Sequence, residues 1–319
     1  MNVVDTTEDE LLGAIARLLS DHAPDVVVGV GDDAAVVRPG GGDIVLTTDA
    51  LVEGSHFARD ASVPRDLGYR AIAVNVSDIA AMAASPRFAL AALTLPPDVD
   101  AAYVTELIGG MRDACAEHGC LLVGGNLASG RDLTLAVTLT GEVAPGRAIT
   151  RAGAGIGDAL VVTGTLGASA AARRVRDDPA RWTDDDRAAL RRAERPTARV
   201  GEAQVLARNG ATAMIDVSDG LALDLSRLCR ASGTGARVDL GAIPVAPTAT
   251  FDEALGGGED YELLATMPLE RVASALEELH EVFGVALTAI GVIIEGDVVG
   301  VGADGSEAPL EPRGWDHFR

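Results

Sequence analysis

The sequence predicts a two-domain protein of α/β or mixed α+β class. Short apolar runs alternate with segments whose apolar residues recur at helical spacing, and this alternation continues through both halves of the chain. The 319 residues are enough for two domains with separate cores, and 48% of them are hydrophobic. Only 3% are aromatic, so the core must consist mainly of alanine and aliphatic side chains. Such a core suits parallel or mixed sheets covered by closely packed helices.

The first half of the chain begins with a predicted helix, because Thr7 and Glu10 form a capping-box pattern. Apolar residues follow it at helical spacing: Leu11, Leu12, Ile15, Leu18 and Leu19. Further helices are predicted at residues 66–84, ended by Ser85-Pro86, and at residues 99–117. Apolar runs predict strands at residues 26–30, 44–46, 88–95, 121–123 and 133–140. The triplet Gly124-Gly125-Asn126 is predicted to turn the chain between the last two strands.

A segment rich in glycine and proline, residues 144–158, predicts the domain boundary. We therefore expect an N-terminal α/β domain of residues 1–145 and a C-terminal α/β domain of residues 146–319. Strands are predicted in the second domain at residues 159–162, 214–217, 261–265 and 286–294, and helices at residues 166–176, 221–231 and 269–283. The charged stretch 173–199 is interpreted as exposed helices and a loop with a solvated face.

The charges exclude several classes of protein. A net charge of −22 argues against binding to nucleic acid or to an anionic membrane, because the field of the protein repels phosphate groups. All 26 residues counted as lysine or arginine are arginine. A Walker A loop, a protein kinase and a pyridoxal enzyme each need a lysine, so none is present in its usual form. Any ATP must be bound through metal ions, arginine and backbone amides.

Cysteine, histidine and hydropathy patterns point to a cytoplasmic protein without a transition-metal centre. No apolar run approaches the roughly 20 residues of a membrane span, and the N-terminus lacks a signal-peptide pattern. Cys115, Cys120 and Cys229 are too few and scattered for a disulfide framework, and we expect them to be buried thiols. The five histidines include no pair at helical metal-binding spacing.

Five stretches are predicted to place an acidic residue in a short glycine, serine or threonine turn at the end of an apolar run. They are Gly31-Asp32-Asp33-Ala34-Ala35, Thr47-Thr48-Asp49, Asn75-Val76-Ser77-Asp78, Asp216-Val217-Ser218-Asp219-Gly220 and Gly257-Gly258-Glu259-Asp260-Tyr261. One such motif alone is more often a turn or helix cap than a ligand set. Five together favour hard oxygen ligands for magnesium, and hence a nucleoside triphosphate. Val-Ser-Asp occurs in two of them, at residues 76–78 and 217–219, and is predicted to open a helix each time.

The ordered motifs GDDAAVV, TTDALVEGSHF, AVNVSDIAAMAA, GGN, TR, DVSDG, GGEDYEL and GWDHF resemble those of the thiamine-monophosphate kinases. That family belongs to the aminoimidazole-ribonucleotide synthetase (PurM-like) superfamily, and the resemblance extends from about Asp25 to Phe318. It implies transfer of the γ-phosphoryl group of ATP to thiamine monophosphate with several magnesium ions. It also implies that the N-terminal domain binds ATP and magnesium and forms a homodimer, in which the N-terminal sheets of two subunits pair into a barrel.

The resemblance implies roles for individual residues. The expected metal ligands are Asp33, Thr47, Thr48, Asp49, Asp78, Asn126, Asp216 and Asp219, with Asp32 beside them. Several family members carry aspartate where this chain has Asn126, which can offer a carbonyl oxygen but no charge. The nucleotide is expected at Gly125, Asn126, Arg151 and Ser218, with Arg147 as an alternative to Arg151. Thiamine monophosphate is expected at His56, Glu259 and Trp315, since an indole and a carboxylate favour a flat cation.

No general base is expected, because the acceptor phosphate is already an anion at neutral pH. Two alternatives remain. One is another member of the superfamily, such as an aminoimidazole-ribonucleotide synthetase, a selenophosphate synthetase or a hydrogenase-maturation protein. The latter two need an N-terminal Cys or selenocysteine with a lysine, or a C-terminal Cys, whereas this chain has no lysine and ends in Phe318-Arg319. The other is a magnesium or nucleotide sensor without catalysis, which Asn126 alone suggests.

Overall fold

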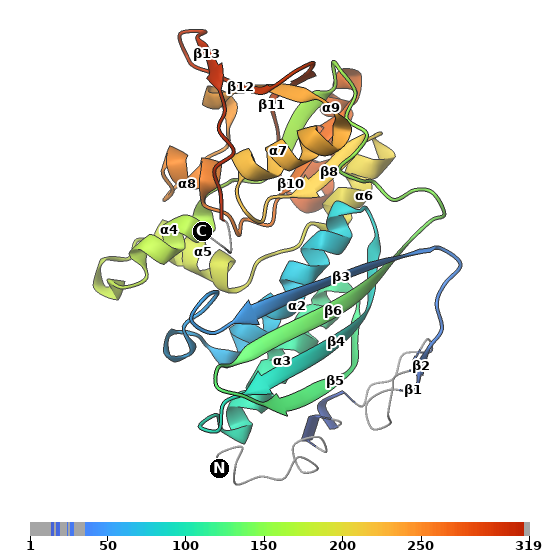
Figure 1. The fold of residues 1–319 in the computed structure, drawn as a ribbon, viewed down its shortest axis with the longest axis vertical. Coiled ribbons are helices and arrows are strands. Elements are labelled where there is room, and N and C mark those ends of the chain that lie inside the picture. The colour runs from blue at the N-terminus through green and yellow to red at the C-terminus, as the bar shows by residue number, and fades with distance from the viewer. Residues whose placement is uncertain (1–13, 16, 20–23, 25, 29–35, 316–319) are drawn as a thin grey trace. The chain divides into compact units, whose positions relative to one another are not determined.

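The computed structural model describes residues 14–15, 17–19, 24, 26–28 and 36–315 (Figure 1). The chain divides into two compact units, one of residues 1–79 and 84–147 and the other of residues 80–83 and 148–319. Each unit contains helices and a sheet of mixed strand direction, which confirms the mixed α+β class. Most of the helix predicted from Thr7 lies outside the described residues. None of the described helices is long and apolar enough to cross a membrane.

The first unit contains a four-stranded sheet in the order β3-β6-β4-β5. These strands are β3 (Asp43–Val52), β6 (Thr134–Val143), β4 (Ser85–Leu95) and β5 (Leu121–Ser129). Neighbours are antiparallel except β4 and β5, which are parallel. Helices α2 (Pro64–Ala81) and α3 (Ala101–His118) lie on one face of the sheet (Figure 1). A separate pair, β1 (Val26–Val28) and β2 (Val36–Val37), is antiparallel, and a short 3-10 helix, η2, spans Arg59–Ala61.

The other face of this sheet is open and largely apolar among the described residues. Strand alternation places Leu46, Leu90 and Ala92 on it, while Leu139 and Leu93 face the helices and are buried. Leu46 is 69% exposed and Leu90 44%. Thr48 and Thr138 share this face with the exposed leucines, and exposed apolar side chains of this size make it a candidate face for contact with another molecule.

Helices α2 and α3 pack with their backbones in close contact. A Cβ atom at Gly110 of α3 would lie 1.8 Å from the Arg65 carbonyl oxygen of α2, and one at Gly68 of α2 would lie 1.9 Å from the Leu107 carbonyl oxygen of α3. Only glycine allows this separation, so the two residues fix how closely the helices approach. Helix α3 ends with Gly119 in the left-handed conformation, with φ of 74°.

The second unit contains a seven-stranded sheet in the order β13-β12-β9-β11-β7-β10-β8. The strands are β7 (Ala159–Thr163), β8 (Ala213–Asp216), β9 (Gly235–Asp239), β10 (Leu263–Met267), β11 (Leu287–Ile294), β12 (Val298–Val301) and β13 (Glu307–Pro309). The helices are α4 (Ala168–Val175), α5 (Asp184–Glu194), α6 (Val200–Arg208), α7 (Leu221–Ser232), α8 (Phe251–Gly256) and α9 (Val272–Phe283). Short 3-10 helices η3, η4 and η5 span Pro179–Arg181, Leu240–Ala242 and Leu269–Arg271.

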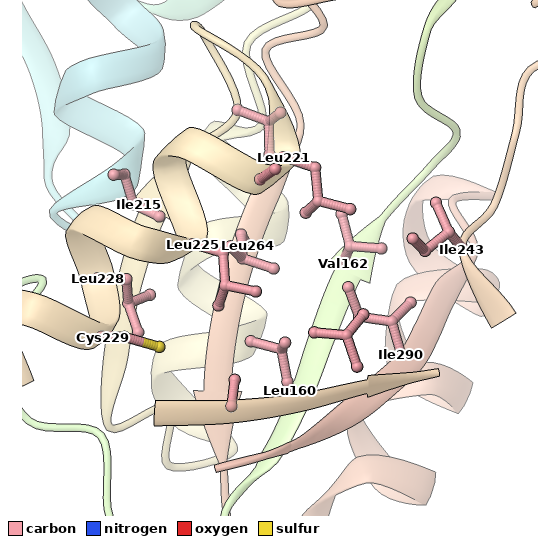
Figure 2. Close-up of a cluster of buried hydrophobic side chains, with 14 of the residues drawn as sticks. Leu160, Val162, Ile215, Leu221, Leu225, Leu228, Cys229, Ile243, Leu264 and Ile290 are labelled. Atoms are coloured by element: carbon pink, nitrogen blue, oxygen red, sulfur yellow. The ribbon is translucent and has the colours of Figure 1, made fainter. Parts of the chain in front are cut away.

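Apolar side chains cover both faces of this sheet. On one face, Leu221, Leu225 and Leu228 of α7 pack against Val162 and Leu264 (Figure 2). On the other, α6 and α9 supply a second buried cluster: Ala203, Val205, Leu206, Ala275 and Leu279. Successive strand residues point to opposite faces, so continuous apolar strands such as β7 and β10 serve both clusters. Cys115, Cys120 and Cys229 are buried free thiols, as predicted.

The Gly110→Ala substitution tests the close helix contact. Alanine normally stabilises a helix interior by about 1 kcal/mol relative to glycine. Here we expect a loss of about 1–3 kcal/mol in the free energy of unfolding, because the new methyl group would overlap the Arg65 carbonyl oxygen. Urea denaturation provides the measurement.

Gly109→Ala is the matched control. A Cβ atom at Gly109 would meet the end of the flexible Arg65 side chain at 3.0 Å, so this variant should be neutral or more stable. Equal stability of both variants would contradict the proposed role of Gly110.

Candidate functional site

Thr47 and Asp78 lie together in the first unit. Thr47 of β3 donates from Oγ1 to Oδ2 of Asp78 on α2, at 2.5 Å. Asp78 is the one residue from Ala71 to Ala80 that is not buried. A carboxylate kept partly exposed on an otherwise buried stretch of helix is difficult to explain by packing alone. It provides a hard oxygen donor beside the threonine.

The strand predicted to end at Leu46 continues to Val52, so that prediction of a turn at Thr47-Thr48-Asp49 is wrong. The two threonines are β-branched and fit a paired strand. Alternation then puts Thr47 and Asp49 on the face toward α2 and Thr48 on the open face. Thr48 donates from Oγ1 to the Val137 carbonyl oxygen at 3.0 Å. The three neighbouring residues therefore divide between two faces of the sheet.

Gly124-Gly125-Asn126 is also inside a strand, and the predicted turn there is wrong. β5 pairs in parallel with β4 as far as Ser129, with Gly125 opposite Ala91 and Asn126 opposite Ala92. The glycine is needed for close approach, because a Cβ atom at Gly125 would lie 1.9 Å from the Ala91 carbonyl oxygen. Asn126 shares the open face with Ala92 and is exposed.

The first Val-Ser-Asp triplet, residues 76–78, does not open a helix as predicted; it lies in the last two turns of α2. The neighbouring Asn75 amide nitrogen donates to the Ala71 carbonyl oxygen at 2.9 Å, four residues back, whereas its Oδ1 is buried without a hydrogen-bond partner among the described residues. The second triplet, residues 217–219, does precede a helix, since α7 begins at Leu221.

His56 lies in a tight turn after β3. Its ring Nδ1 accepts from the Val52 backbone N–H at 3.1 Å, and the backbone N–H of His56 donates to the Val52 carbonyl oxygen at 2.9 Å. Because Nδ1 is an acceptor, the neutral imidazole carries its proton on Nε2. The turn therefore fixes both the ring orientation and its tautomer.

Three turns of the second unit are joined through their backbones. The Glu259 N–H donates to the Ser218 carbonyl oxygen at 2.6 Å, and the Trp315 N–H donates to the Asp219 carbonyl oxygen at 2.9 Å. A further bond of 2.9 Å joins the Tyr261 N–H to the Val217 carbonyl oxygen. The predicted residues Ser218, Asp219, Glu259 and Trp315 are therefore neighbours, although they are up to 97 residues apart in sequence (315 − 218).

Backbone conformations at this junction are unusual. Gly258 has φ of +67°, and a Cβ atom there would lie 2.7 Å from the Ser218 carbonyl oxygen. Glu259 and Tyr261 also have positive φ, at 59° and 52°, although neither is glycine. Such conformations cost about 1–3 kcal/mol each and concentrate at functional sites.

The Asp219 turn is held by a second carboxylate that sequence reasoning missed. Asp224 of α7 accepts through Oδ2 from the N–H groups of Asp219 and Gly220, at 2.9 and 3.1 Å. Arg227 Nη1 contacts both Asp219 Oδ2 and Asp224 Oδ1, at 2.5 and 2.7 Å. Burial raises the pKa of Asp224 to about 6 despite these partners. An aspartate five residues after Asp219, in the first turn of a predicted helix, was the available signal.

The strand end at Asp216 is buried, and Asp216 pairs with Leu263 of β10. Arg151 is exposed, and its carbonyl oxygen accepts from Ser232 Oγ at 2.8 Å. Arg147 is also exposed but belongs to the other unit, so the choice between the two arginines stays open. Asp32 and Asp33 lie outside the described residues.

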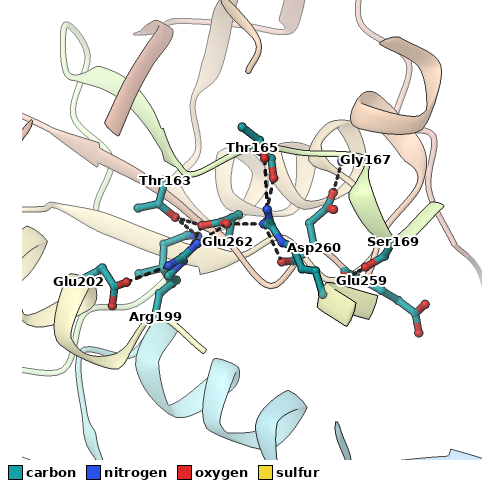
Figure 3. Close-up of polar contacts among 11 residues, drawn as sticks. Thr163, Thr165, Gly167, Ser169, Arg199, Glu202, Glu259, Asp260 and Glu262 are labelled. Carbon is teal, nitrogen blue, oxygen red and sulfur yellow. Dashed lines mark hydrogen bonds and ion pairs between the residues drawn. The ribbon is translucent and has the colours of Figure 1, made fainter. Parts of the chain in front are cut away.

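A buried ion cluster supports the loop that carries Glu259 (Figure 3). Glu262 is fully buried and is contacted by Arg192 and by Arg199, with Arg199 Nη2 at 2.7 Å and Nε at 2.8 Å. Thr163 donates to the same carboxylate at 2.6 Å. The prediction of a solvated face for residues 173–199 is thus wrong at its C-terminal end, because these two arginines compensate a buried charge.

Asp260, next to Glu259, is also buried. Its Oδ2 accepts from the Gly167 N–H at 2.7 Å, while Oδ1 has no hydrogen-bond partner among the described residues. Burial raises the pKa of Asp260 to about 6, an effect only partly offset by the Gly167 bond and the charge of Arg192. The loop therefore contains a carboxyl group that titrates well above its ordinary range.

The donor set of the first unit fits magnesium. Thr47, Asp49 and Asp78 offer hard oxygens on one side of the sheet, and Mg²⁺ is bound through such oxygens with waters and phosphates. Across the described residues, no three His, Cys, Asp or Glu side chains gather into a metal-binding group. The predicted set includes threonine and asparagine and is divided between the two units.

Two family models match the chain. Residues 31–143 match the N-terminal domain of AIR synthase related proteins, and residues 155–304 match the C-terminal domain. The thiamine-monophosphate kinase of Escherichia coli O157:H7 is 39% identical over 307 residues, covering 92% of this chain and 93% of that protein.

Solved structures also match this chain over most of its length. The thiamine-monophosphate kinase of Stenotrophomonas maltophilia K279a matches with a TM-score of 0.83 at 34% identity, covering 93% of this chain and 96% of that one. The structure of AaThiL complexed with AMPPCP and TMP matches with a TM-score of 0.78 at 33% identity, covering 100% and 99% of the two chains.

The pKa of Asp260 predicts how stability depends on pH. Between about pH 4 and pH 6 the unfolded chain ionises this group while the folded protein keeps it protonated, so its contribution to stability falls as pH rises. A shift of roughly two units corresponds to about 3 kcal/mol. Asp260→Asn does not titrate, and we expect it to gain about that much relative to wild type between pH 4 and pH 7.5, measured by urea unfolding.

Asp304→Asn provides the control. Hydrogen bonds from Ser306 lower the pKa of Asp304, so this group affects the pH dependence of stability only below about pH 4, and the variant should show no gain relative to wild type between pH 4 and pH 7.5. Identical pH profiles for wild type and Asp260→Asn would contradict the assignment of a raised pKa.

Proposed function

Since the chain belongs to the thiamine-monophosphate kinases, which are AIR synthase related proteins and phosphotransferases, we propose that it phosphorylates thiamine monophosphate with ATP. The product would be thiamine diphosphate. The observation that supports this most is the clustering of Ser218, Asp219, Glu259 and Trp315 around one backbone junction. A relative that matches over the whole chain binds AMPPCP and TMP, which supports the same substrates here.

The proposed reaction is a direct in-line transfer. An oxygen of the thiamine monophosphate phosphate forms a bond to the γ-phosphorus of ATP, the bond to the β–γ bridging oxygen breaks, and ADP leaves. The acceptor is an anion at neutral pH, so no general base is required. The work of the protein is to align the two phosphates and to compensate their charge.

Several magnesium ions would be held by Asp33, Thr47, Thr48, Asp49, Asp78, Asn126, Asp216 and Asp219. When bound, they would neutralise polyphosphate charge in a protein whose own net charge is −22. Thr47 orients Asp78 through their 2.5 Å bond, and Arg227 orients Asp219. Both carboxylates are thus fixed before a ligand arrives, which reduces the ordering required on binding.

The nucleotide would contact Gly125, Asn126, Arg151 and Ser218, with Arg147 as the alternative guanidinium. Thiamine monophosphate would bind at His56, Glu259 and Trp315. Trp315 is half exposed, and its backbone and that of Glu259 bond to the same turn, at Asp219 and Ser218. An exposed indole near a carboxylate suits a flat cationic ring. His56, with its proton on Nε2, can donate to a phosphate oxygen. The use of ATP supports a cytoplasmic location.

We also propose that two subunits join through the N-terminal sheet. β3 and β5 are its outer strands among the described residues, and its apolar face is open. Asp49 and Gly125 lie in one cross-strand row but on opposite edges, roughly 14 Å apart at three strand spacings. A barrel formed with a partner subunit would pair the outer strands β3 and β5 with those of the partner and bury the apolar face. It would also place a second copy of Asp49 and Gly125 near the two edges of the sheet.

Incubation with ATP, Mg²⁺ and thiamine monophosphate tests the proposed reaction. We expect thiamine diphosphate and ADP in equal amounts, and no product after chelation of the metal. Asp78→Ala and Asp219→Ala should each reduce turnover below about one thousandth while the circular dichroism spectrum is retained, because each removes a charge-balancing ligand.

Asp184→Ala is the control carboxylate, since Asp184 is fully exposed and contacts Arg187 three residues away. It should leave turnover unchanged. If the wild-type protein binds ATP but forms no diphosphate, the chain is instead a nucleotide sensor, and Asn126→Asp is the variant to examine next.

The proposed dimer is tested by Leu46→Glu. Leu46 is 69% exposed in the single subunit, so the charge should not disturb the fold, but it would be buried in a barrel interior. We expect sedimentation velocity to show a dimer for wild type and a monomer for this variant. Leu269→Glu, at a site 68% exposed in the second unit, should remain a dimer. A monomeric wild type at micromolar concentration would remove the proposal.

A further inference from the structure

Helix α4 holds the loop of residues 257–260 at successive points. The Gly167 N–H, at the start of the helix, donates to Asp260 Oδ2 at 2.7 Å. Two residues further on, Ser169 Oγ donates to the Glu259 carbonyl oxygen at 2.6 Å. Arg173 then donates from Nη2 to the Gly257 carbonyl oxygen at 2.5 Å and from Nη1 to Glu259 Oε2 at 2.6 Å.

Ser169 and Arg173 are four residues apart and therefore lie on one face of α4. Together they fix both ends of Glu259: the serine holds its carbonyl oxygen and the arginine its carboxylate. Figure 3 shows Ser169 and Glu259 meeting beside Asp260. The backbone of Glu259 is in the left-handed region, so its side-chain direction depends on these contacts holding that conformation.

We propose that Arg173 is a positioning residue that sets the direction of the Glu259 carboxylate for the cationic ring of the substrate. This inference rests on the proposed binding of thiamine monophosphate at Glu259. The Arg173 side chain is 48% exposed and that of Glu259 29%, and exposed ion pairs of this kind contribute little to stability. The second bond, to the Gly257 carbonyl oxygen, fixes the guanidinium itself, which a simple surface ion pair would not need.

Charge supports a positioning role over direct ring binding. A guanidinium would repel a thiazolium cation, so Arg173 acts through Glu259 rather than on the ring. One donor of the planar guanidinium contacts the Glu259 carboxylate while the other is held on the Gly257 carbonyl oxygen, so the carboxylate is directed more strictly than by a single ammonium group. Removing the guanidinium should therefore leave Glu259 charged but mobile.

The experiment compares Arg173→Gln with wild type in steady-state kinetics. We expect KM for thiamine monophosphate to rise about tenfold, with KM for ATP and kcat nearly unchanged, as expected for loss of a charge-assisted hydrogen bond used in binding. Arg173→Lys should recover part of the affinity. Arg174→Gln is the matched control. Arg174 also contacts one carboxylate and one carbonyl oxygen, but these belong to Glu253 and Thr248 instead of Glu259 and Gly257. It should leave both KM values unchanged.

A double-mutant cycle with Glu259→Gln identifies the route of the effect. If Arg173 acts through Glu259, Arg173→Gln should add no further loss in the Glu259→Gln background, and binding of thiamine and of thiamine monophosphate should weaken by the same factor. Additive losses confined to the phosphorylated ligand would overturn the inference and assign Arg173 to the phosphate. Normal KM in Arg173→Gln with an active wild type would also overturn it, whereas an inactive wild type would refute the proposed function itself.

Discussion

Backbone hydrogen bonds among three turns of the second unit determine where the predicted substrate residues lie. A tight turn leaves polar backbone groups unpaired, and buried groups of this kind must find partners. Here the turns at Ser218, Glu259 and Trp315 satisfy one another. These bonds require the backbone segments to approach closely. Gly258 allows this because it has no side chain to collide with the Ser218 carbonyl oxygen. The positive φ of Glu259 follows from the same close approach.

Arginine compensates the buried and partly buried carboxylates behind this junction. Glu262 lies between Arg192 and Arg199, Asp219 contacts Arg227, and Glu259 contacts Arg173. In a chain without lysine, each contact uses a planar group with several donors, which fixes direction as well as charge. The excess of acidic residues therefore is not simply a solvated surface. Part of it contacts arginines of α4, α5 and α7, and Arg199, the residue before α6.

The sequence predicted the class of fold, the core strands of both units except β9, and the residues that gather around Asp219. It could not predict two local conformations, for one shared reason. Thr47-Thr48-Asp49 and Gly124-Gly125-Asn126 have the composition of turns, but pairing of β3 with β6 and of β5 with β4 overrides that local preference. Residues 76–78 lie inside the helix predicted at residues 66–84, so only the interpretation of Val-Ser-Asp as a helix start was wrong there. Arg173 was missed because its partners Gly257 and Glu259 are distant in sequence and adjacent only in space, whereas Asp224 and Arg227 lie within eight residues of Asp219 and were overlooked.

These corrections change how the first unit presents its oxygen donors. Side chains on loops move, whereas Thr47 and Asp49 on a paired strand and Asp78 on a buried helix are held by regular hydrogen bonding. Strand alternation then decides which donors can act together: Thr47 and Asp49 share a face, and Thr48 lies on the other with Asn126. A ligand set that looks continuous in sequence is therefore two sets in space, and only the one facing α2 includes the Thr47–Asp78 contact.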